Sequence, residues 1–398
     1  MIRRDFLKIG ALTGASLYCG NLTAEETTND QSVIYIFLSG GVTQIETINP
    51  IPDAPVEFRS IRGNVKTKHG YLLGGDFKDM AKISDKFTTV RGFHQNSASH
   101  GIATVNVNTG ITGRLDQPME PSYGSIVAHQ FGTNAYNGVP NYVKVGNFRG
   151  TEPVWMGKKY DGFVPTSEGI GNLSSRVPQE RLDERLSLII ERDVPGAESW
   201  KDLRDQATGI LRGSAAEAFK IELEPKEVQE AYGVGKSSIG RDFLKARRLV
   251  ESKSRFVTIN IGGWDNHSGL SANFARRGVE LDKYLAVLIS DLADRGMSNT
   301  LVVVTSEFAR TPKINGNASR DHWAQTGTLI LAGGNSEHGR VIGSTNTNGQ
   351  YVVSGEYLPR DLLRTITDHM GIDHNLTVMD PENRPRHIVN HESRNILV

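Results

Sequence analysis

Three short apolar runs constrain the fold most, because each one is followed at once by small or polar residues. The runs are residues 33–38, 256–261 and 301–304. Each is continuously apolar rather than alternating, which is typical of a strand covered on both faces of a parallel sheet. In such sheets ligands bind outside the carboxyl ends of the strands. The sequence therefore predicts an α/β fold, with a mostly parallel sheet flanked by helices and one shared crevice at the strand ends.

The rest of the chain fits this plan. Residues 87–90 predict a further strand, which leads through a polar loop into a helix that ends near Gly110. Apolar residues at helical spacing predict an inserted helical segment over about 178–231, and a helix over about 273–295 that completes a βαβ unit. Residues 140–175 are rich in Gly, Pro, Asn and Ser, so we expect surface loops there.

The first residues predict export. Arg3 and Arg4 precede Phe-Leu-Lys and a short apolar segment, the pattern of a twin-arginine (Tat) signal peptide. We expect residues 1–24 to be this signal, and 25–398 to be one folded domain delivered by the Tat machinery to the periplasm or secreted. No later segment reaches the roughly 20 apolar residues that a membrane span needs, so no transmembrane segment is expected in the mature chain.

Composition narrows the classes of function. The chain has 45 basic and 45 acidic side chains, so nothing favours nucleic acid as a partner. Cys19 is the only cysteine, and loss of the signal leaves no disulfide and no thiolate metal site. A lipid anchor at Cys19 is disfavoured because Tyr18 stands where a small residue would be expected.

Four side chains near the ends of the second and third runs suggest a metal site. They are Asp265, His267, Glu307 and His322. Carboxylates and imidazoles without thiolate suit a divalent metal such as Zn, Mn or Fe, with positions left open for water and substrate. Asp-x-His alone is a weak signal, and its alternative is an aspartate that caps a loop beside a surface histidine.

Three further residues are candidates for catalysis. Arg310 follows Glu307 by three positions, where its guanidinium would either clamp a phosphate or sulfate group or pair with Glu307 to orient it. Ser99 and His100 lie where a loop enters a helix, whose free N–H groups favour an anion. Either serine of this loop, Ser97 or Ser99, could be a nucleophile and His100 a base or ligand; the alternative is simple helix capping.

Four segments of the chain resemble the Tat-exported DUF1501 family (domain of unknown function), which is distantly related to the alkaline phosphatase and sulfatase superfamily. They are residues 37–43, 262–267, 306–312 and 320–323. The resemblance covers nearly the whole mature chain and implies an alkaline-phosphatase-like sheet. It also shows departures: no Asp stands at the end of the first run, so Glu46 would have to replace it, and Glu307-Phe308 replaces an Asp-His ligand pair.

The nucleophile motif of the superfamily, Cys or Ser followed by x-Pro-x-Arg, is absent. A standard two-metal phosphatase or a formylglycine sulfatase is therefore disfavoured. Two hypotheses stay open. The first is an exported metal-dependent hydrolase of phosphate or sulfate esters, acting on a small-molecule or polysaccharide ester. The second is a catalytically degenerate member that binds a glycan or cell-surface partner.

Overall fold

The computed structural model describes residues 30–111, 120–132, 134, 138–171, 173, 180, 181, 184 and 215–398. The predicted signal peptide and most of the predicted helical insertion lie outside these residues. At the centre is a seven-stranded sheet with the strand order β11-β4-β10-β7-β1-β6-β5. Its strands are β1 (Ser32–Phe37), β4 (Phe87–Val90), β5 (Tyr142–Val145), β6 (Phe256–Asn260), β7 (Thr300–Thr305), β10 (Leu329–Gly333) and β11 (Val341–Ile342).

Only β10 runs against its neighbours in this sheet. The strands β7, β1, β6 and β5 are parallel in that order, with β1 between β6 and β7. The mostly parallel α/β sheet predicted from the sequence is therefore confirmed. Because these strands are parallel, the residues that follow β1, β6 and β7 lie at one edge of the sheet, as expected.

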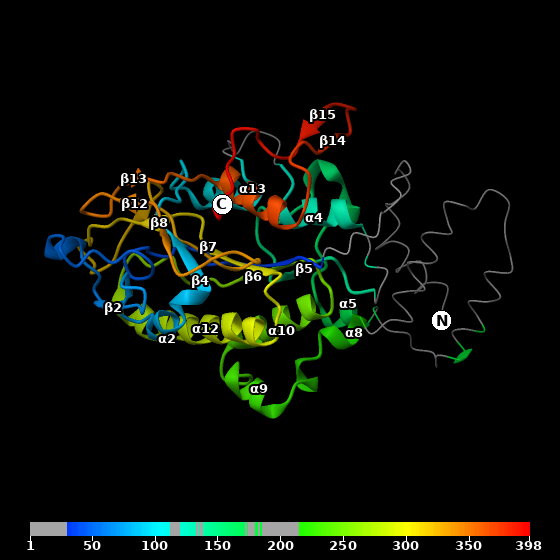
Figure 1. Ribbon diagram of the computed structural model, residues 1–398, viewed down its shortest axis with the longest axis horizontal. Helices are drawn as coiled ribbons and strands as arrows, with labels where there is room; N and C mark the ends of the chain where they lie inside the picture. Colours follow the sequence, from blue (N-terminus) through cyan, green and yellow to red (C-terminus); the bar gives the residue numbers. More distant parts are fainter. Residues whose placement is uncertain are drawn as a thin grey trace.

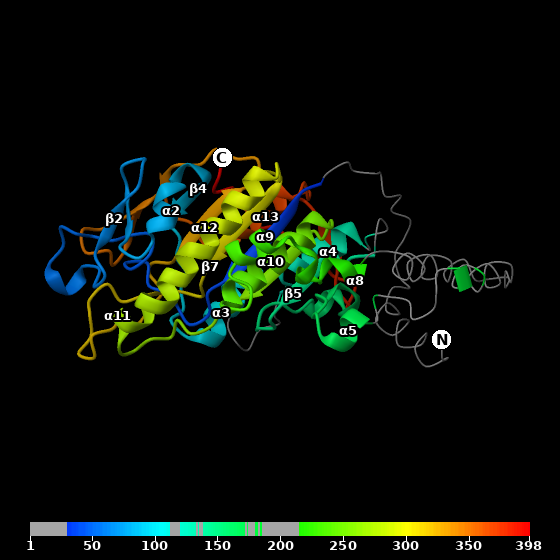
Figure 2. The ribbon, with the colours of Figure 1, turned by 90° about the horizontal axis from the view of Figure 1, so that it is seen from below.

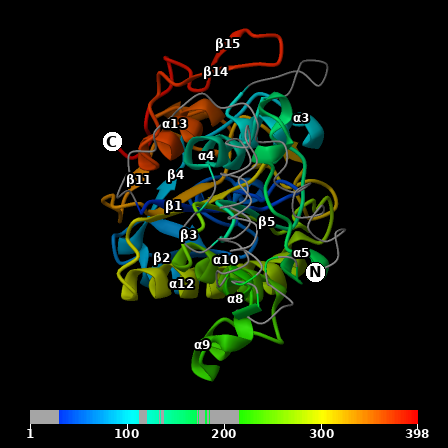
Figure 3. The same cartoon turned by 90° about the vertical axis from the view of Figure 1, so that its right-hand side faces the viewer.

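Helices cover both faces of the sheet (Figure 1). The helices of the described structure are α2 (Lys78–Lys82), α3 (His100–Thr109), α4 (Tyr123–Phe131), α5 (Ser167–Gly171), α8 (Ala215–Ala218), α9 (Lys226–Ala231), α10 (Ser238–Glu251), α11 (Leu270–Asn273), α12 (Val279–Asp294) and α13 (Pro359–His369). The layer of α2, α10 and α12 lies under the sheet, and α12 and α10 run side by side across it in Figure 2. Figure 3 shows α3, α4 and α13 on the opposite face.

The side chains of β1 explain why both faces are covered. Ile34 and Ile36 belong to the core under α10 and α12, whereas Val33, Tyr35 and Phe37 belong to the core under α4 and α13. All five are at most 1% exposed. Since successive strand residues point to opposite faces, a continuously apolar strand must be buried on both sides.

Short ribbons and turns complete the described structure. The two-stranded ribbons are β2 (Asn64–Lys66) with β3 (Leu72–Gly74), β8 (Ala309–Arg310) with β9 (His322–Trp323), β12 (Ser344–Thr345) with β13 (Val352–Ser354), and β14 (Thr377–Met379) with β15 (Pro385–His387). The 3-10 turns are Val56–Phe58, Ser84–Lys86, Val154–Met156, Lys158–Tyr160 and Ile221–Leu223, and η6 (Phe274–Gly278) is a π-helical turn. Among the described helices, none has the length and apolar character needed to cross a membrane.

One expectation about the fold was wrong. Residues 140–175 were expected to be surface loops, but β5 is a fully buried strand of the main sheet. Lys144 interrupts the apolar pattern of this strand in the sequence. The structure buries Lys144 to 3% exposure and pairs its Nζ with Asp161 at 2.7 Å, so the ammonium is neutralised inside the fold.

Candidate functional site

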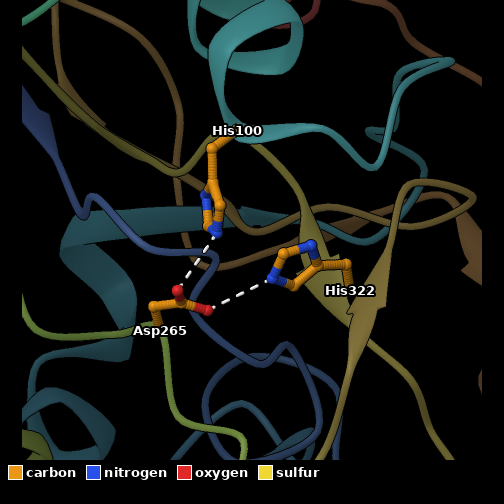
Figure 4. Close-up of side chains that lie close together, drawn as sticks. All are labelled: His100, Asp265 and His322. Carbon is orange, nitrogen blue, oxygen red and sulfur yellow. Dashed lines mark hydrogen bonds and ion pairs between the residues drawn. The ribbon is translucent and has the colours of Figure 1, made fainter.

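Five of the predicted site residues meet at the carboxyl edge of the sheet. Asp265 and His267 lie on the loop after β6, and Glu307 follows β7. His322 lies on β9, and His100 begins α3. Figure 4 shows the side chains of His100 and His322 pointing at the carboxylate of Asp265 from different elements. Because β6, β1 and β7 are parallel neighbours, Asp265, His267 and Glu307 lie at the same edge of the sheet.

Three imidazoles present the same ring nitrogen to Asp265. The Nε2 atom of His100 lies 3.3 Å from Oδ2 of Asp265, and Nε2 of His322 lies 3.2 Å from Oδ1. The Nε2 atom of His267 lies 3.1 Å from Oδ1 and 3.1 Å from Nε2 of His322. Of the described residues, His100, Asp265 and His322 form the group whose donor atoms all lie within 4.8 Å of one another.

The other nitrogen of each ring is held by an oxygen. These contacts are His100 Nδ1 to Glu307 Oε1 at 2.7 Å, His267 Nδ1 to Asp321 Oδ1 at 2.7 Å, and His322 Nδ1 to the carbonyl of Ala98 at 3.0 Å. An acceptor at Nδ1 fixes the ring orientation and turns Nε2 towards the cluster, where it could bind a metal once any proton on it is released. The sequence did not identify Asp321 as a functional residue, although its place beside His322 was a usable signal.

Arg310 is 1% exposed and bonded on all sides. Its Nη2 donates to Asp265 Oδ1 at 2.5 Å and to the carbonyl of Gly40, and its Nε donates to the carbonyl of Gly41 at 2.8 Å. The ion pair is thus with Asp265, and not with Glu307 as considered from the sequence. In this arrangement Arg310 orients the carboxylate, and its role as an anion clamp stays a prediction.

The electrostatic setting keeps Asp265 ionised. Partial burial alone would raise the pKa of this carboxyl, but hydrogen bonds from Arg310 and His322, together with nearby positive charge, lower the pKa well below its ordinary value. A hydrogen bond from His267 likewise lowers the pKa of Asp321. Both groups are therefore carboxylates across the neutral pH range.

Glu307 lies behind His100 rather than beside the Nε2 atoms. Its side chain is 2% exposed, and Oε1 accepts the backbone N–H of Gly40 at 2.7 Å in addition to its contact with His100. The Oγ atom of Ser306 lies 3.0 Å from the other carboxylate oxygen of Glu307, Oε2. Gly40 has φ +119°, and a Cβ there would lie 2.4 Å from the backbone nitrogen of Asp265. Only glycine permits this close approach of the β1 tip to the Asp265 loop.

An aromatic ring packs against two of the imidazoles of the site. Phe308 is 1% exposed, and its ring centroid lies 4.9 Å from that of His100 and 4.7 Å from that of His322. A Cβ on Gly41 would meet this ring at 2.4 Å. The position after Glu307 therefore serves to pack the two imidazoles and supplies no ligand.

The remaining candidates lie at the margin of the site or away from it. Ser99 is exposed at the N-cap of α3, and its side chain makes no capping bond. No described base contacts its hydroxyl, and its role as nucleophile stays a prediction. Glu46, the suggested substitute for a missing aspartate, is fully buried and pairs with Arg320 at 3.0 Å. It makes no contact with the cluster.

Replacing Glu307 with glutamine is expected to lower the pKa of His100. The hydrogen bond to the Glu307 carboxylate, reinforced by its charge and that of Asp265, raises this pKa against the opposing effect of partial burial. NMR titration of His100 in metal-free protein measures the change. The pKa of His100 is raised in the folded protein, so the His100–Glu307 pair stabilises the fold fully below the ordinary histidine pKa of about 6.5. This stabilisation is lost as the pH rises through the folded-state pKa of His100. Asp321→Asn is the control, and an equal shift of His100 in it would contradict the assignment to Glu307.

Together these features define an α/β protein with a histidine and carboxylate cluster at the carboxyl edge of a mostly parallel sheet. The model of the family described as a protein of unknown function (DUF1501) matches residues 30–397. The chain therefore belongs to this family, as the sequence motifs predicted. A comparison with curated proteins gave no match.

Solved structures similar to this chain include a sulfatase, a synthase and a phosphonate monoester hydrolase. A sulfatase from Pseudoalteromonas sp. is 13% identical with a TM-score of 0.42, covering 94% of this chain and 73% of its own. The lipoteichoic acid synthase LtaP from Listeria monocytogenes is 11% identical with a TM-score of 0.38, covering 98% and 81%. A phosphonate monoester hydrolase from Silicibacter pomeroyi is 11% identical with a TM-score of 0.35, covering 92% and 75%. At these values the likeness says nothing about activity.

Proposed function

We propose that the protein is an exported, metal-dependent hydrolase of phosphate or sulfate esters. The observation that carries the proposal is the shared design of three imidazoles, each anchored at Nδ1 and each presenting Nε2 to the ionised Asp265. Such anchoring by carboxylate or carbonyl oxygens is the usual outer environment of metal-bound histidines. An ordinary surface cluster of histidines needs no anchor of this kind.

The residues fit a divalent metal. Two nitrogen or oxygen ligands about 2.1 Å from a tetrahedral ion lie about 3.4 Å from each other. Nε2 of His100 lies 3.3 Å from Oδ2 of Asp265 and Nε2 of His322 lies 3.2 Å from Oδ1, so each imidazole is close to that spacing from one of the two carboxylate oxygens. We assign these three as ligands and His267 as a further ligand, so that Glu307 and Asp321 support His100 and His267. Nitrogen and oxygen donors without thiolate favour Zn, Mn or Fe.

The chain's own groups then divide the work. A divalent ion in this cluster would supply a Lewis acid for the ester oxygen and activate water as a nucleophile. Arg310 holds Asp265 in its ionised form. The amino end of α3, which carries His100, faces the cluster, and its first N–H groups favour an anionic ester. Water as the nucleophile is consistent with the absence of a base at Ser99 within the described structure.

Export by the Tat route and a periplasmic or secreted location belong to the same proposal. They rest on Arg3, Arg4 and the short apolar segment that follows, which lie outside the described residues. The Tat route transports folded proteins, which suits a protein that takes up its metal before export.

One observation favours the alternative, a binding protein without turnover. The guanidinium of Arg310 is already bonded to Asp265 and to backbone carbonyls, so a substrate anion would have to compete with these contacts for it. In that case the protein would bind a glycan or cell-surface partner, and the histidine and carboxylate cluster would have no catalytic role. The two functions differ in turnover, and the hydrolase requires in addition that the folded protein holds a metal.

Metal analysis separates them. For protein purified without added metal or chelator, we expect about one equivalent of Zn, Mn or Fe, and chelation should abolish turnover of 4-nitrophenyl phosphate or sulfate. Re-addition of the same metal should restore turnover. A well-folded protein that holds no metal, even after incubation with all three ions, would reject the hydrolase and favour the binding function.

A further inference from the structure

A second arginine lies against the turn that carries Asp265. Arg277 belongs to η6, and its Nη1 donates to the carbonyl of Gly262 at 2.8 Å. Asn273, four residues earlier, donates to the carbonyl of Gly263 at 3.2 Å. Gly263 has φ +93°, and a Cβ there would lie 2.7 Å from Cζ of Arg277. The guanidinium therefore rests directly on the backbone of Gly263, which only a glycine allows.

The charge of Arg277 has no carboxylate partner among the described residues. Buried arginines elsewhere in the fold are paired with acids, as Arg310 is with Asp265 and Arg320 is with Glu46. For Arg277 the described contacts are to a backbone carbonyl, and its Nε and Nη2 donate to no described acceptor. A partly exposed guanidinium fixed by the backbone, with two adjacent donors left open, matches the fork geometry that binds sulfate, phosphate or carboxylate.

Arg277 lies close to the candidate site. Trp264 is 2% exposed and packs against Phe274 of η6, whereas Gly263 and Asp265 on either side of it are exposed. Gly263 is two residues before Asp265, a span of at most about 7 Å, so Arg277, which packs on Gly263, lies near the cluster. The π-helical turn that carries Arg277 is a rare element that occurs frequently at functional sites.

We propose that Arg277 forms a subsite for a second anionic group on the substrate, next to the ester that reacts. This inference rests on the proposed function for the position of the reacting ester. It names the substrate class as polyanionic, such as a chain bearing repeated sulfate or phosphate groups, rather than a single isolated ester. The anionic group would accept hydrogen bonds from Nε and Nη2 of Arg277 while Nη1 stays bonded to Gly262.

The test is direct binding, without turnover. Calorimetry measures the affinity of the metal-loaded full chain for dextran sulfate oligosaccharides, for short polyphosphate and for neutral dextran, each at two salt concentrations. We expect both anions to bind and dextran not to bind, and the tighter anion identifies the group. Arg277→Gln should weaken binding by about tenfold or more, since one charge-assisted contact is lost. Gln keeps a donor for the Gly262 carbonyl, which limits the structural effect.

Arg276→Gln is the matched control, because it removes the same charge from the neighbouring exposed position of η6. Its affinity for the anions should match that of the wild type. Equal weakening in both variants, or wild-type binding no tighter to the anions than to dextran, would overturn the subsite. Loss of binding in Arg277→Gln alone, in a protein that hydrolyses no ester, would leave the subsite standing and reject only the proposed function.

Discussion

Asp265→Ala is expected to abolish both metal retention and ester hydrolysis. Asp265 is the carboxylate on which the Nε2 atoms of His100, His267 and His322 converge. Loss of even an anchoring residue behind a metal ligand typically reduces metal affinity or activity by 10- to 100-fold, so loss of the shared ligand should reduce turnover by at least about a hundredfold. Metal content and turnover of 4-nitrophenyl esters are the measurements.

Two controls separate this effect from unfolding. Alanine at 265 also leaves the buried Arg310 without its carboxylate, so Asp265→Asn is the better-matched variant because its amide oxygen can still accept from Nη2. Asp321→Asn should have a smaller effect, since the side chain of Asp321 contacts Nδ1 of His267, the ring nitrogen that does not contact Asp265. Full activity in a folded Asp265→Asn protein would show that the cluster is not the active site.

Glu46→Ala is expected to lower the free energy of unfolding substantially. Glu46 and Arg320 are both 0% exposed and lie 3.0 Å apart, and the carboxylate also accepts from Ser60 and the backbone N–H of Ile61. Removing one member of a buried ion pair leaves a buried charge without a partner, which typically destabilises by about 3–5 kcal/mol. Urea unfolding measures the change in the free energy of unfolding.

An exposed ion pair provides the comparison. Glu392 pairs with Arg360 at 2.9 Å but is 75% exposed at its side chain, so Glu392→Ala should change the free energy of unfolding by no more than about 1 kcal/mol. Glu46→Gln should lie between the two, because it keeps hydrogen-bonding atoms but loses the charge. Similar changes for Glu46→Ala and Glu392→Ala would contradict the assigned role of the buried pair.

Much of the fold was predictable because its signals are local. The apolar runs at 33–38, 256–261 and 301–304 became β1, β6 and β7, and the helix expected to end near Gly110 ends there, with that glycine at φ +78°. Strand β5 was not predicted because Lys144 interrupts its apolar run. The residue that neutralises Lys144, Asp161, is 17 residues away in the sequence. A pattern within one window cannot reveal such a partner.

The site was predictable in its members but not in their contacts. Chain order and the parallel sheet placed Asp265, His267 and Glu307 at one edge, and His322 was associated with them by its loop. The sequence left Glu307 as a ligand and His100 as a nucleophile, base or ligand. The structure instead sets Glu307 against Nδ1 of His100, 207 residues away, and sets Arg310 against Asp265.

The sequence by itself determined β1, β4, β6 and β7, the helices α3 and α12, the chemistry of the site's side chains and the edge of the sheet where they gather. These features follow from hydrophobic periodicity and from the rule that ligands bind at the carboxyl ends of parallel strands. Both signals can be recognised from residues that are close together in the sequence. Tertiary structure alone decided which oxygen holds which imidazole, which acid the buried Arg310 and Arg320 pair with, and that Arg277 has no acidic partner among the described residues. Such pairings depend on distances of about 3 Å between side chains from separate elements, and those distances exist only after the helices and strands have packed.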